Sequence, residues 1–444
     1  MYINASMPMK NKCLYIVLAL CCCMWSCTSR QEQEPTPQPQ DTAQVVPVRT
    51  PKSAKRGVAY SFRKPSVDSY LLGNSISWFY NWGNTTSEEM LTLGEFYGFE
   101  FLPMAWNANY DANKIKQYIQ SHPQCKYILA FNEPNLTDQA RMTPRQAADE
   151  WPKLKALADE LQVQIVAPAM NYGTLSGYGD PIKWLDEFFS YVPLSDVCAI
   201  AIHCYMAYPS ALKSYVERFY KYNLPIWMTE FCAWEAETKK PQSMEEQRDF
   251  CAEAVAYMEA DPHVERYAWF IPRYNGYPYM ALISGDDMMT EVGQVYCHSS
   301  AQHADIYYAA GQRIEAENYA RCNVSDCIGK EGFSKPVHLA ASKDADGVLD
   351  LIDVNKDQWV EYQIEAHADA TYEFAFRCAS THYTDVSIYK GDKMLGFINI
   401  EGDEEENMKD YWCSIPLTKG QHVLRLVTHG EPFRMNHFQF AIIQ

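Results

Sequence analysis

The sequence lacks the features that mark several common classes of protein. It has no excess of basic residues, since 38 Lys and Arg stand against 56 Asp and Glu and give a net charge of −18. Nucleic-acid binding depends on a basic footprint, so this balance excludes that class and favours a neutral substrate. No CxxC pair, no Cys/His cluster with zinc spacing and no GxGxxG after the first predicted strand occurs. Zinc sites and dinucleotide sites therefore have no support.

A long apolar run is also missing, even at the N-terminus. The run from Cys13 to Trp25, which follows Lys10 and Lys12, is shorter than the roughly 20 residues of a membrane-spanning helix and fits a secretory signal. Its end, Ser26-Cys27, resembles the lipobox of bacterial lipoproteins, in which the Cys is lipidated; a plain signal peptide cut nearby is the alternative. We expect a signal over residues 1–27, lipidation at Cys27, and a secreted lipoprotein at the outer membrane, the cell surface or in the periplasm.

The segment after the signal has almost no large apolar residue. Residues 28–55 are rich in Gln, Pro and Thr, which predicts a disordered, partly polyproline tether. With the lipid anchor, this tether would hold a monomeric folded part at a membrane surface. The rest of the chain has the composition of a folded protein, because hydrophobic residues make up 47% and charged residues 21%. The length of 444 residues predicts two or three domains.

The middle of the chain, residues 56–300, alternates short apolar runs with amphipathic segments. Thr143 and Ser243 stand where helix caps belong, each followed by an amphipathic segment. Eight β/α units in about 250 residues are typical of a (β/α)8 TIM barrel, whereas an open doubly wound sheet is the competing fold. The predicted strands are Gly57–Tyr60, Ser75–Asn81, Glu100–Trp106, Lys126–Asn132, Gln164–Met170, Ala199–Tyr205, Pro225–Glu230 and Arg266–Phe270; the predicted helices include Asn113–Ser121, Thr143–Leu161 and Ser243–Ala260.

Two glutamates stand at the ends of predicted strands. Glu133 follows the fourth strand in Asn132-Glu133-Pro134, and Glu230 ends the seventh in Thr229-Glu230. In a TIM barrel both would reach the catalytic mouth, at the carboxyl ends of the strands. Glycoside hydrolysis needs two carboxyl groups beside the scissile bond, one to protonate the leaving oxygen and one to attack or activate water. The pattern predicts that these two glutamates form such a pair.

The segments around the two glutamates resemble the clan A retaining glycoside hydrolases, and within them family 128, whose members are endo-acting β-1,3-glucanases. The similarity spans about residues 56–298 and is carried by Leu129–Asn135, the helix of Trp151, Val166–Ala169 and Ile226–Phe231. It implies that Glu133 is the acid/base and Glu230 the nucleophile, with no metal or organic cofactor. It also implies that the charge of Glu230 raises the pKa of Glu133.

The same resemblance assigns expected roles to five neighbours of the glutamates. Asn132 would hydrogen-bond the sugar 2-hydroxyl. His203 and Tyr205 end the sixth strand and would contact the nucleophile, although a core histidine and a packed tyrosine are the alternative. Trp106 and Trp269 would stack on sugar faces, with a place in the barrel core as the alternative.

The C-terminal third, residues 305–444, loses the helical rhythm. Its short alternating runs predict a β-sandwich domain with a jelly-roll-like arrangement. The predicted strands are Gly311–Glu317, Trp359–Ile364, Thr371–Ala379, Thr384–Lys390, Tyr411–Ile415, His422–Val427 and Met435–Ala441.

Several motifs in this third resemble the family 6 carbohydrate-binding modules, among them Ile314–Tyr319, Trp359–Tyr362, Arg377–Ser380, Gly420–Leu426 and Met435–Phe438. The resemblance implies a glycan-binding cleft at the loop ends, with Tyr383, Trp412 and Asn436 as its candidates. It also implies a structural Ca2+ held by Glu315 and Glu317. The glycine-rich stretch usual in the family is reduced to Lys330–Phe333. Cys322 and Cys327 are close enough in sequence for a local disulfide.

The sequence thus predicts an anchored, retaining endo-β-1,3-glucanase with a polysaccharide as its substrate and partner. One alternative is a clan A glycosidase that acts on xylan, mannan or β-1,4-glucan. Another is a surface lipoprotein that binds glycan without hydrolysing it. For the C-terminal domain alone, the alternative is a module that packs against the rest of the protein and no longer binds a ligand.

Overall fold

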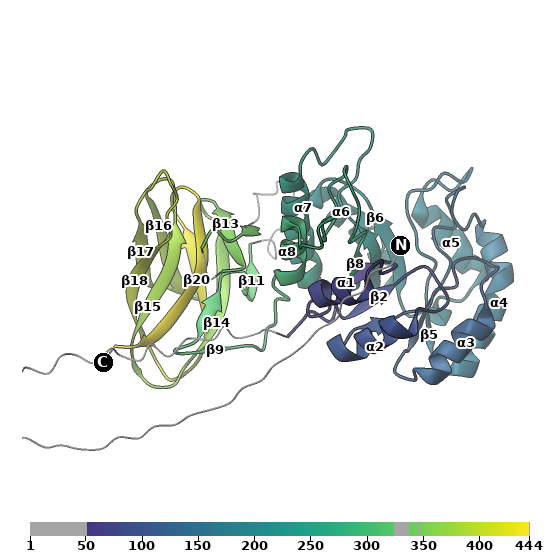
Figure 1. The fold of residues 1–444 in the computed structure, drawn as a ribbon, viewed down its shortest axis with the longest axis horizontal. Coiled ribbons are helices and arrows are strands. Elements are labelled where there is room, and N and C mark those ends of the chain that lie inside the picture. The colour runs from purple at the N-terminus through teal and green to yellow at the C-terminus, as the bar shows by residue number, and fades with distance from the viewer. Residues whose placement is uncertain (1–50, 324–336, 345–346, 444) are drawn as a thin grey trace, which may run out of the picture. The chain divides into compact units, whose positions relative to one another are not determined.

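The computed structural model describes residues 51–323, 337–344 and 347–443. The predicted signal, Cys27, most of the tether, Cys327 and the segment 330–333 lie outside these residues. Within them, no helix is both long and apolar enough to cross a membrane. The ribbon in Figure 1 shows α/β structure from purple to teal, and strands alone from green to yellow.

Eight strands and eight helices alternate through the first part of the described chain. Each observed strand overlaps one of the eight predicted strands, although most are shorter. The strands are β1 Arg56–Ala59, β2 Trp78–Tyr80, β3 Glu100–Phe101, β4 Tyr127–Leu129, β5 Gln164–Val166, β6 Ile200–Cys204, β7 Ile226–Phe231 and β8 Val264–Trp269. The helices are α1 Pro65–Leu72, α2 Glu88–Tyr97, α3 Ala112–Ser121, α4 Pro144–Leu161, α5 Pro181–Tyr191, α6 Pro209–Glu217, α7 Met244–Ala260 and α8 Glu291–His298, with 3-10 turns at Leu194–Asp196 and Tyr220–Tyr222.

These strands run parallel but do not form one continuous ladder. Six of them form a sheet in the order β3-β2-β1-β8-β7-β6, and β4 pairs only with β5. Single parallel bridges join Met104 to Leu129 and Val166 to Ala199. The predicted continuous eight-stranded sheet is therefore interrupted on both sides of the β4–β5 pair. This part of the chain is α/β, and all its strands have their carboxyl ends on the same side.

The helix starts follow from local sequence. The Thr143 side chain accepts from the backbone of Gln146, whose side chain accepts in return from the Thr143 N–H, so α4 opens on a full capping box. Ser243 caps α7 in the same way, but the Glu246 carboxylate accepts instead from Lys240 and the Gln242 N–H. The predicted box at Ser243 is thus only half formed.

The last turn of α7 is closed by a side chain from the start of the domain. The Lys55 ammonium donates to the carbonyls of Met258, Glu259 and Asp261 at 2.9–3.0 Å. These carbonyls have no partner within the helix, so a positive donor satisfies them and also complements the helix dipole. The contact ties the residue before β1 to the C-terminal end of α7.

The C-terminal part consists of two antiparallel sheets. One has the order β12-β13-β20-β15-β18 with β10 beside β20, and the other β11-β14-β19-β16-β17 with β9 beside β14. The rings of Tyr362 and Phe438, one from each sheet, have centroids 4.9 Å apart, so the sheets pack face to face. The strands are β9 Tyr308–Ala309, β10 Arg313–Glu315, β11 Arg321–Cys322, β12 His338–Ala341, β13 Leu349–Val354, β14 Trp359–Ala366, β15 Ala370–Ala379, β16 Thr384–Lys390, β17 Lys393–Ile400, β18 Lys409–Leu417, β19 Gly420–Thr428 and β20 Phe433–Ile442.

Candidate active site

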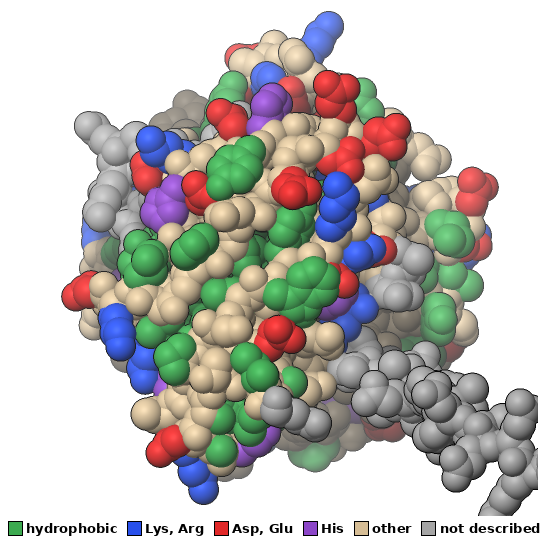
Figure 2. All heavy atoms as spheres, turned by 90° about the vertical axis from the view of Figure 1, so that its left-hand side faces the viewer, with side chains coloured by type: hydrophobic (Ala, Val, Ile, Leu, Met, Phe, Trp, Pro, Cys, Tyr) green, Lys and Arg blue, Asp and Glu red, His purple; other side chains and the backbone are tan. Residues whose placement is uncertain are grey.

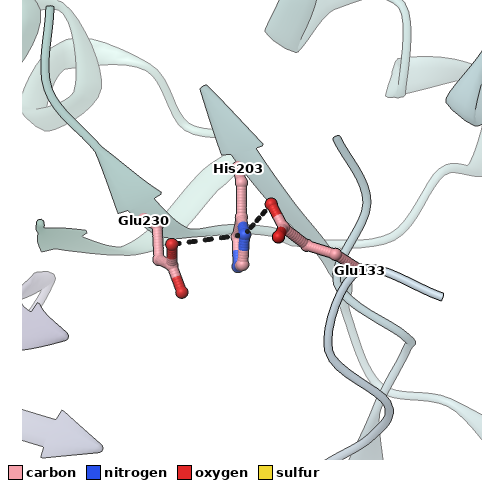
Figure 3. Close-up of side chains that lie close together, drawn as sticks. All are labelled: Glu133, His203 and Glu230. Carbon is pink, nitrogen blue, oxygen red and sulfur yellow. Dashed lines mark hydrogen bonds and ion pairs between the residues drawn. The ribbon is translucent and has the colours of Figure 1, made fainter. Parts of the chain in front are cut away.

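The two predicted glutamates meet at the carboxyl ends of the strands, with His203 between them (Figure 3). One carboxylate oxygen of Glu133, one of Glu230 and a ring nitrogen of His203 all lie within 4.8 Å of one another. All three side chains are buried, with exposed fractions of 6%, 4% and 0%. A buried pair of carboxylates this close must share protons or donors, because two bare charges would repel in a site of low dielectric.

His203 reaches this position through the pairing of β6 with β7. The register of the two strands shifts after Ile202 and sets His203 directly opposite Glu230. Its Nδ1 lies 2.9 Å from Glu133 Oε1 and 3.5 Å from Glu230 Oε2. Bulges of this kind are frequent beside active sites, where they redirect a side chain. The expected contact with the nucleophile is thus present, but the shorter contact is with the other glutamate.

Glu133 sits in a tight turn after β4. Its φ of 44° lies in the left-handed region, which a non-glycine residue adopts at a cost of about 1–2 kcal/mol. The turn is held because the Glu133 N–H donates to the Ala169 carbonyl at 3.0 Å and its own carbonyl accepts from Leu136. Its Oε1 accepts from Asn171 Nδ2 at 3.0 Å as well as from His203. The strained backbone therefore serves to aim one carboxylate at its two partners.

Glu230 is surrounded by hydrogen-bond donors. Its Oε1 accepts from the Tyr80 hydroxyl and from Trp82 Nε1, both at 2.8 Å. Its Oε2 accepts from the Tyr205 hydroxyl in a short hydrogen bond. An ionised carboxylate accepts at both oxygens and donates at neither, so this set of donors matches the charged form and fixes its plane.

The pKa values of Glu133 and His203 move in opposite directions. Burial alone would raise the pKa of Glu133, but the charge of His203 and the hydrogen bonds from His203 and Asn171 outweigh it and hold the pKa below its usual range. Burial would lower the pKa of His203, but the charges of Glu230 and Glu133 raise it. The expected rise in the pKa of Glu133 is therefore not found, because the sequence did not reveal the imidazole, whose effect outweighs burial.

Two of the remaining predicted residues lie at this site. Asn132 is 3% exposed; its Nδ2 donates to Gln139 at 3.3 Å, and no donor in the described part of the chain reaches its buried Oδ1. Trp106 is partly exposed after β3, and its carbonyl accepts from the Asn132 N–H. Trp106 keeps a surface that a substrate could contact, whereas Asn132 is buried and offers an acceptor oxygen that no described group uses.

Trp269 does not lie at the site surface. It is 0% exposed, packs edge-on against Phe231, and its Nε1 donates to the Met280 carbonyl at 2.7 Å. A fully covered ring cannot stack on a sugar, so the predicted role of Trp269 is wrong. The aromatic ring that packs on Trp82 and Tyr205 at the site is that of Phe270, which directly follows β8.

Sequence reasoning missed three groups that hold the carboxylates: Tyr80, Trp82 and Asn171. Tyr80 and Trp82 flank the end of β2, and Asn171 follows the parallel bridge of Met170 with Ile202. All three stand at or just after the ends of predicted strands, so the rule that located Glu133 and Glu230 would also have pointed to them.

Two carboxylates and an imidazole at this spacing are also donors that a divalent cation could use. Among the described residues, this is the one group of three or more metal-ligating side chains close enough to hold an ion. However, the acceptor positions of Glu230 are taken by Tyr80, Trp82 and Tyr205. We assign no metal here, because the surroundings serve a hydrogen-bonded carboxylate rather than a coordinated one.

The predicted glycan-binding residues of the C-terminal domain are not alike in exposure. Asn436 is 0% exposed; its Nδ2 donates to Asp350 at 2.9 Å and its Oδ1 accepts from Arg313 at 3.0 Å. Both the nitrogen and the oxygen of the amide are therefore hydrogen-bonded inside the domain, so the predicted role of Asn436 in a cleft is wrong. Tyr383 and Trp412 are 57% and 60% exposed and remain available.

The predicted calcium ligands also differ from each other. Glu315 forms an ion pair with Arg313 at 2.8 Å. Glu317 is 4% exposed, and its Oε2 has no hydrogen-bond partner among the described residues. Burial, with the charges of Glu315 and Asp350, raises the pKa of Glu317 well above its usual range. A buried carboxyl oxygen without a donor fits a cation, whereas the paired Glu315 does not.

Comparison with known proteins agrees with this division of the chain. The family described as "Glycosyl hydrolase catalytic core" matches residues 57–296, and "Carbohydrate binding module (family 6)" matches residues 334–441. A GH128 subgroup II endo-β-1,3-glucanase from Pseudomonas viridiflava is 38% identical over 55% of this chain and 98% of its own, with a TM-score of 0.52. Its counterpart from Sorangium cellulosum is 32% identical over 55% of this chain and 97% of its own, with a TM-score of 0.49.

A curated relative, alkali-sensitive linkage protein 1 of Schizosaccharomyces pombe, is 28% identical over 258 residues. The match covers 55% of this chain and 44% of the relative, so this chain spans less than half the length of that protein. The catalytic-core match, by contrast, covers more than half of this chain. The protein whose two buried glutamates face each other across His203 is therefore a glycoside hydrolase and belongs to the glycosyl hydrolase catalytic core family.

Proposed function

We propose that the protein is a retaining, endo-acting enzyme that hydrolyses β-1,3-glucan. The relative from Pseudomonas viridiflava, which this chain matches over 98% of its length at 38% identity, is described as an endo-β-1,3-glucanase. The observation that carries the mechanism is the separation of the carboxylates, whose nearest oxygens lie within 4.8 Å. Retaining enzymes hold their carboxyl groups about 5–5.5 Å apart, whereas inverting enzymes leave about 6.5–9.5 Å for a water molecule.

In this proposal, Glu230 attacks the anomeric carbon. The donors Tyr80, Trp82 and Tyr205 orient its carboxylate, and the bond from its oxygen to the anomeric carbon forms the covalent glycosyl-enzyme. The bond between the anomeric carbon and the leaving oxygen breaks as that oxygen takes a proton from Glu133. Asn132 Oδ1, which no described donor reaches, accepts a hydrogen bond from a sugar hydroxyl, and Trp106 supplies an aromatic surface.

His203 supplies the proton that Glu133 needs. The opposite pKa shifts favour the proton on His203 Nδ1, 2.9 Å from Glu133 Oε1. The proton passes to Glu133 and then to the leaving oxygen, which leaves His203 neutral and Glu133 ionised. Glu133 next removes a proton from water, whose oxygen attacks the anomeric carbon and releases Glu230. The proton returns from Glu133 to His203, so the cycle consumes one water and no cofactor.

We also infer that the eight parallel strands close into a (β/α)8 barrel. The isolated bridges on each side of the β4–β5 pair support closure, since they continue the parallel order from β3 to β4 and from β5 to β6. A barrel would bring the ends of β4 and β7 to one mouth, as the catalytic pair requires. The C-terminal domain would then serve as a glycan-binding module, and the N-terminus as a lipid anchor at Cys27.

The test of the proposed function uses purified protein on β-1,3-glucan, mixed-linkage glucan, xylan and mannan, with reducing ends counted beside a Glu230→Gln control. Hydrolysis of β-1,3-glucan that is absent in the control is the expected result. Activity on xylan or mannan alone would keep the mechanism and overturn the substrate. No release from any polymer would favour a protein that only binds glycan.

Two accessory proposals have direct tests. Loss of fatty-acid labelling in a Cys27→Ser variant would support the anchor, and unchanged labelling would overturn it. Added Ca2+ should raise the melting temperature of the wild type but not that of Glu317→Gln, because the cation would replace the proton on the buried carboxyl. An equal response in both proteins would rule out calcium at Glu317.

A further inference from the structure

The edge strands of the two C-terminal sheets lie next to each other without pairing. β17 ends one sheet and β18 ends the other, and each has a single neighbour in its ladder, β16 and β15 respectively. The Tyr411 and Cys413 side chains of β18 reach the backbone of Glu401 and Phe397 across the seam. Between the two strands a hollow of about 600 Å³ opens to solvent, lined by residues 395–399 and 411–414. We call this hollow the edge seam.

Large aromatic and apolar side chains stand exposed along the edge seam. Trp412 is 60% exposed, Phe397 54% and Met394, just before the hollow, 52%. Asn399 and Ser414 are exposed beside them, each two residues from an aromatic on its own strand and therefore on the same side of the sheet. Figure 2 looks onto this side of the C-terminal domain, and green hydrophobic side chains lie among tan atoms across its middle. A contiguous exposed apolar patch of this kind often marks a site that binds a ligand or a partner.

The floor of the edge seam is closely packed. A Cβ on Gly396 would lie 2.4 Å from Cys413 Sγ, so a larger residue there would displace the Cys413 side chain. Ile398 and Ile415 beneath them are 3% and 0% exposed. The hollow therefore has a rigid base, and a ligand would meet side chains that are already in place, which lowers the entropic cost of binding.

We propose that the edge seam binds a β-glucan chain, at a place apart from the loop ends where the sequence predicted a cleft. A sugar ring needs an aromatic face for its C–H side and amides or hydroxyls for its rim, and Trp412, Phe397, Asn399 and Ser414 supply both. The family 6 carbohydrate-binding match includes both strands. The choice of glucan as the ligand rests on the proposed function of the catalytic domain.

A second copy of the chain is the competing occupant, since unpaired strand edges can join. The sequence of the two strands works against it. Lys393 and Lys409 begin β17 and β18, and lysine on an edge discourages strand addition. Pro416 near the end of β18 has no N–H to donate. A neutral chain that stacks on aromatic rings does not need those backbone donors.

The test measures depletion of the full-length protein by insoluble β-1,3-glucan. All variants carry Glu230→Gln, so that the polymer is not degraded. Trp412→Ala should weaken partition onto the polymer by about tenfold, as expected for the loss of one aromatic anchor. Trp412→Tyr should restore most of the binding, and Phe397→Ala should weaken it in its own right. Phe96→Ala, which removes an exposed aromatic side chain of α2 outside the hollow, is the matched control and should bind as the parent does. Tyr383→Ala probes the predicted loop-end cleft instead.

The outcomes separate this site from the proposed function. Equal binding by the parent, Trp412→Ala and Phe397→Ala overturns the edge seam, even if the enzyme with Glu230 intact hydrolyses β-1,3-glucan. A loss of binding in Tyr383→Ala alone moves the site to the loop ends and also overturns it. If the protein binds glucan through Trp412 but hydrolyses no β-1,3-glucan, the edge seam is supported and the proposed function fails. A change from dimer to monomer on Trp412→Ala would assign the seam to a second copy instead.

Discussion

Replacing His203 by Gln should move the basic limb of the pH–rate profile to lower pH. In the wild type, the proton shared by Glu133 and His203 stays in the site until the pH exceeds the pKa of His203, which the two carboxylates raise above its ordinary value. In the variant, the carboxyl of Glu133 alone must hold that proton. The cation that lowers the pKa of Glu133 is then gone, so this pKa rises, but a carboxyl still starts from a lower reference value than an imidazole.

The reference values set the size of the effect. Imidazole and glutamate carboxyl groups differ by about two pKa units, which is about 100-fold in the protonated fraction at a pH above both. Burial and the charge of Glu230 reduce that gap, so kcat/KM at neutral pH should fall about 10- to 100-fold. At acidic pH, where Glu133 keeps its own proton, most of the rate should return. A merely structural role of His203 would lower the rate by the same factor at every pH.

The assay is reducing-end release from soluble β-1,3-glucan at a series of pH values, with melting temperatures measured alongside. Tyr205→Phe is the matched control, because it removes a donor to Glu230 from the residue two places along the chain and leaves the imidazole in place. It should lower kcat with the basic limb unmoved. A His203→Gln profile that keeps the wild-type basic limb would refute the proton transfer from His203.

Three further changes test other parts of the structure. Trp82→Phe removes one of two donors to Glu230 Oε1 and should lower kcat about tenfold, a loss of about 1.4 kcal/mol; an unchanged kcat would show that Tyr80 suffices. EDTA should leave the hydrolysis rate unchanged, since the account routes no step through a metal, and a loss of rate that Mg2+ or Zn2+ restores would contradict it. Lys55→Met removes the donor to the last carbonyls of α7 and should destabilise the protein by about 1–3 kcal/mol in chemical denaturation, with Lys126→Met, on the exposed surface, as a control that stays near wild type.

The positions of the catalytic pair could be predicted because they depend on a simple rule. Glu133 and Glu230 each follow an apolar run, and the ends of parallel strands meet on one side of a sheet. The contact between His203 and Glu133 could not, because it depends on the register shift after Ile202, which no residue pattern announces. The direction of the pKa shift of Glu133 failed for the same reason.

Other differences come from side chains whose direction the sequence leaves open. Trp269 ends β8, and the sequence does not tell whether an aromatic side chain at a strand end faces the mouth or the surrounding helices. In the structure its ring is fully buried against Phe231 and Tyr296. Asn436 was placed in the cleft by its likeness to an Asn near the last strand of the family 6 modules. Instead it joins a buried network with Asp350 and Arg313. Polar residues inside a domain are recognised only once their partners are known.

Strand lengths were overestimated where single bridges replace ladders. The sequence predicted a strand over Glu100–Trp106, but β3 covers Glu100–Phe101 and continues only through the bridge of Met104 with Leu129. The apolar pattern persists beyond the ladder because those residues still face the core. In the C-terminal domain, β17 escaped prediction because Gly396 and exposed side chains at Met394 and Phe397 interrupt the expected alternation. Those interruptions are the features that form the edge seam.

The most direct test of the central claim is proton NMR of the first products released from β-1,3-glucan. Retention by way of a Glu230 ester predicts that the β-anomer appears first and converts slowly to the equilibrium mixture, and that Glu230→Gln gives no product while its melting temperature stays near that of the wild type. Initial release of the α-anomer, or β-glucan cleavage by Glu230→Gln at the wild-type rate, would contradict the proposed double displacement.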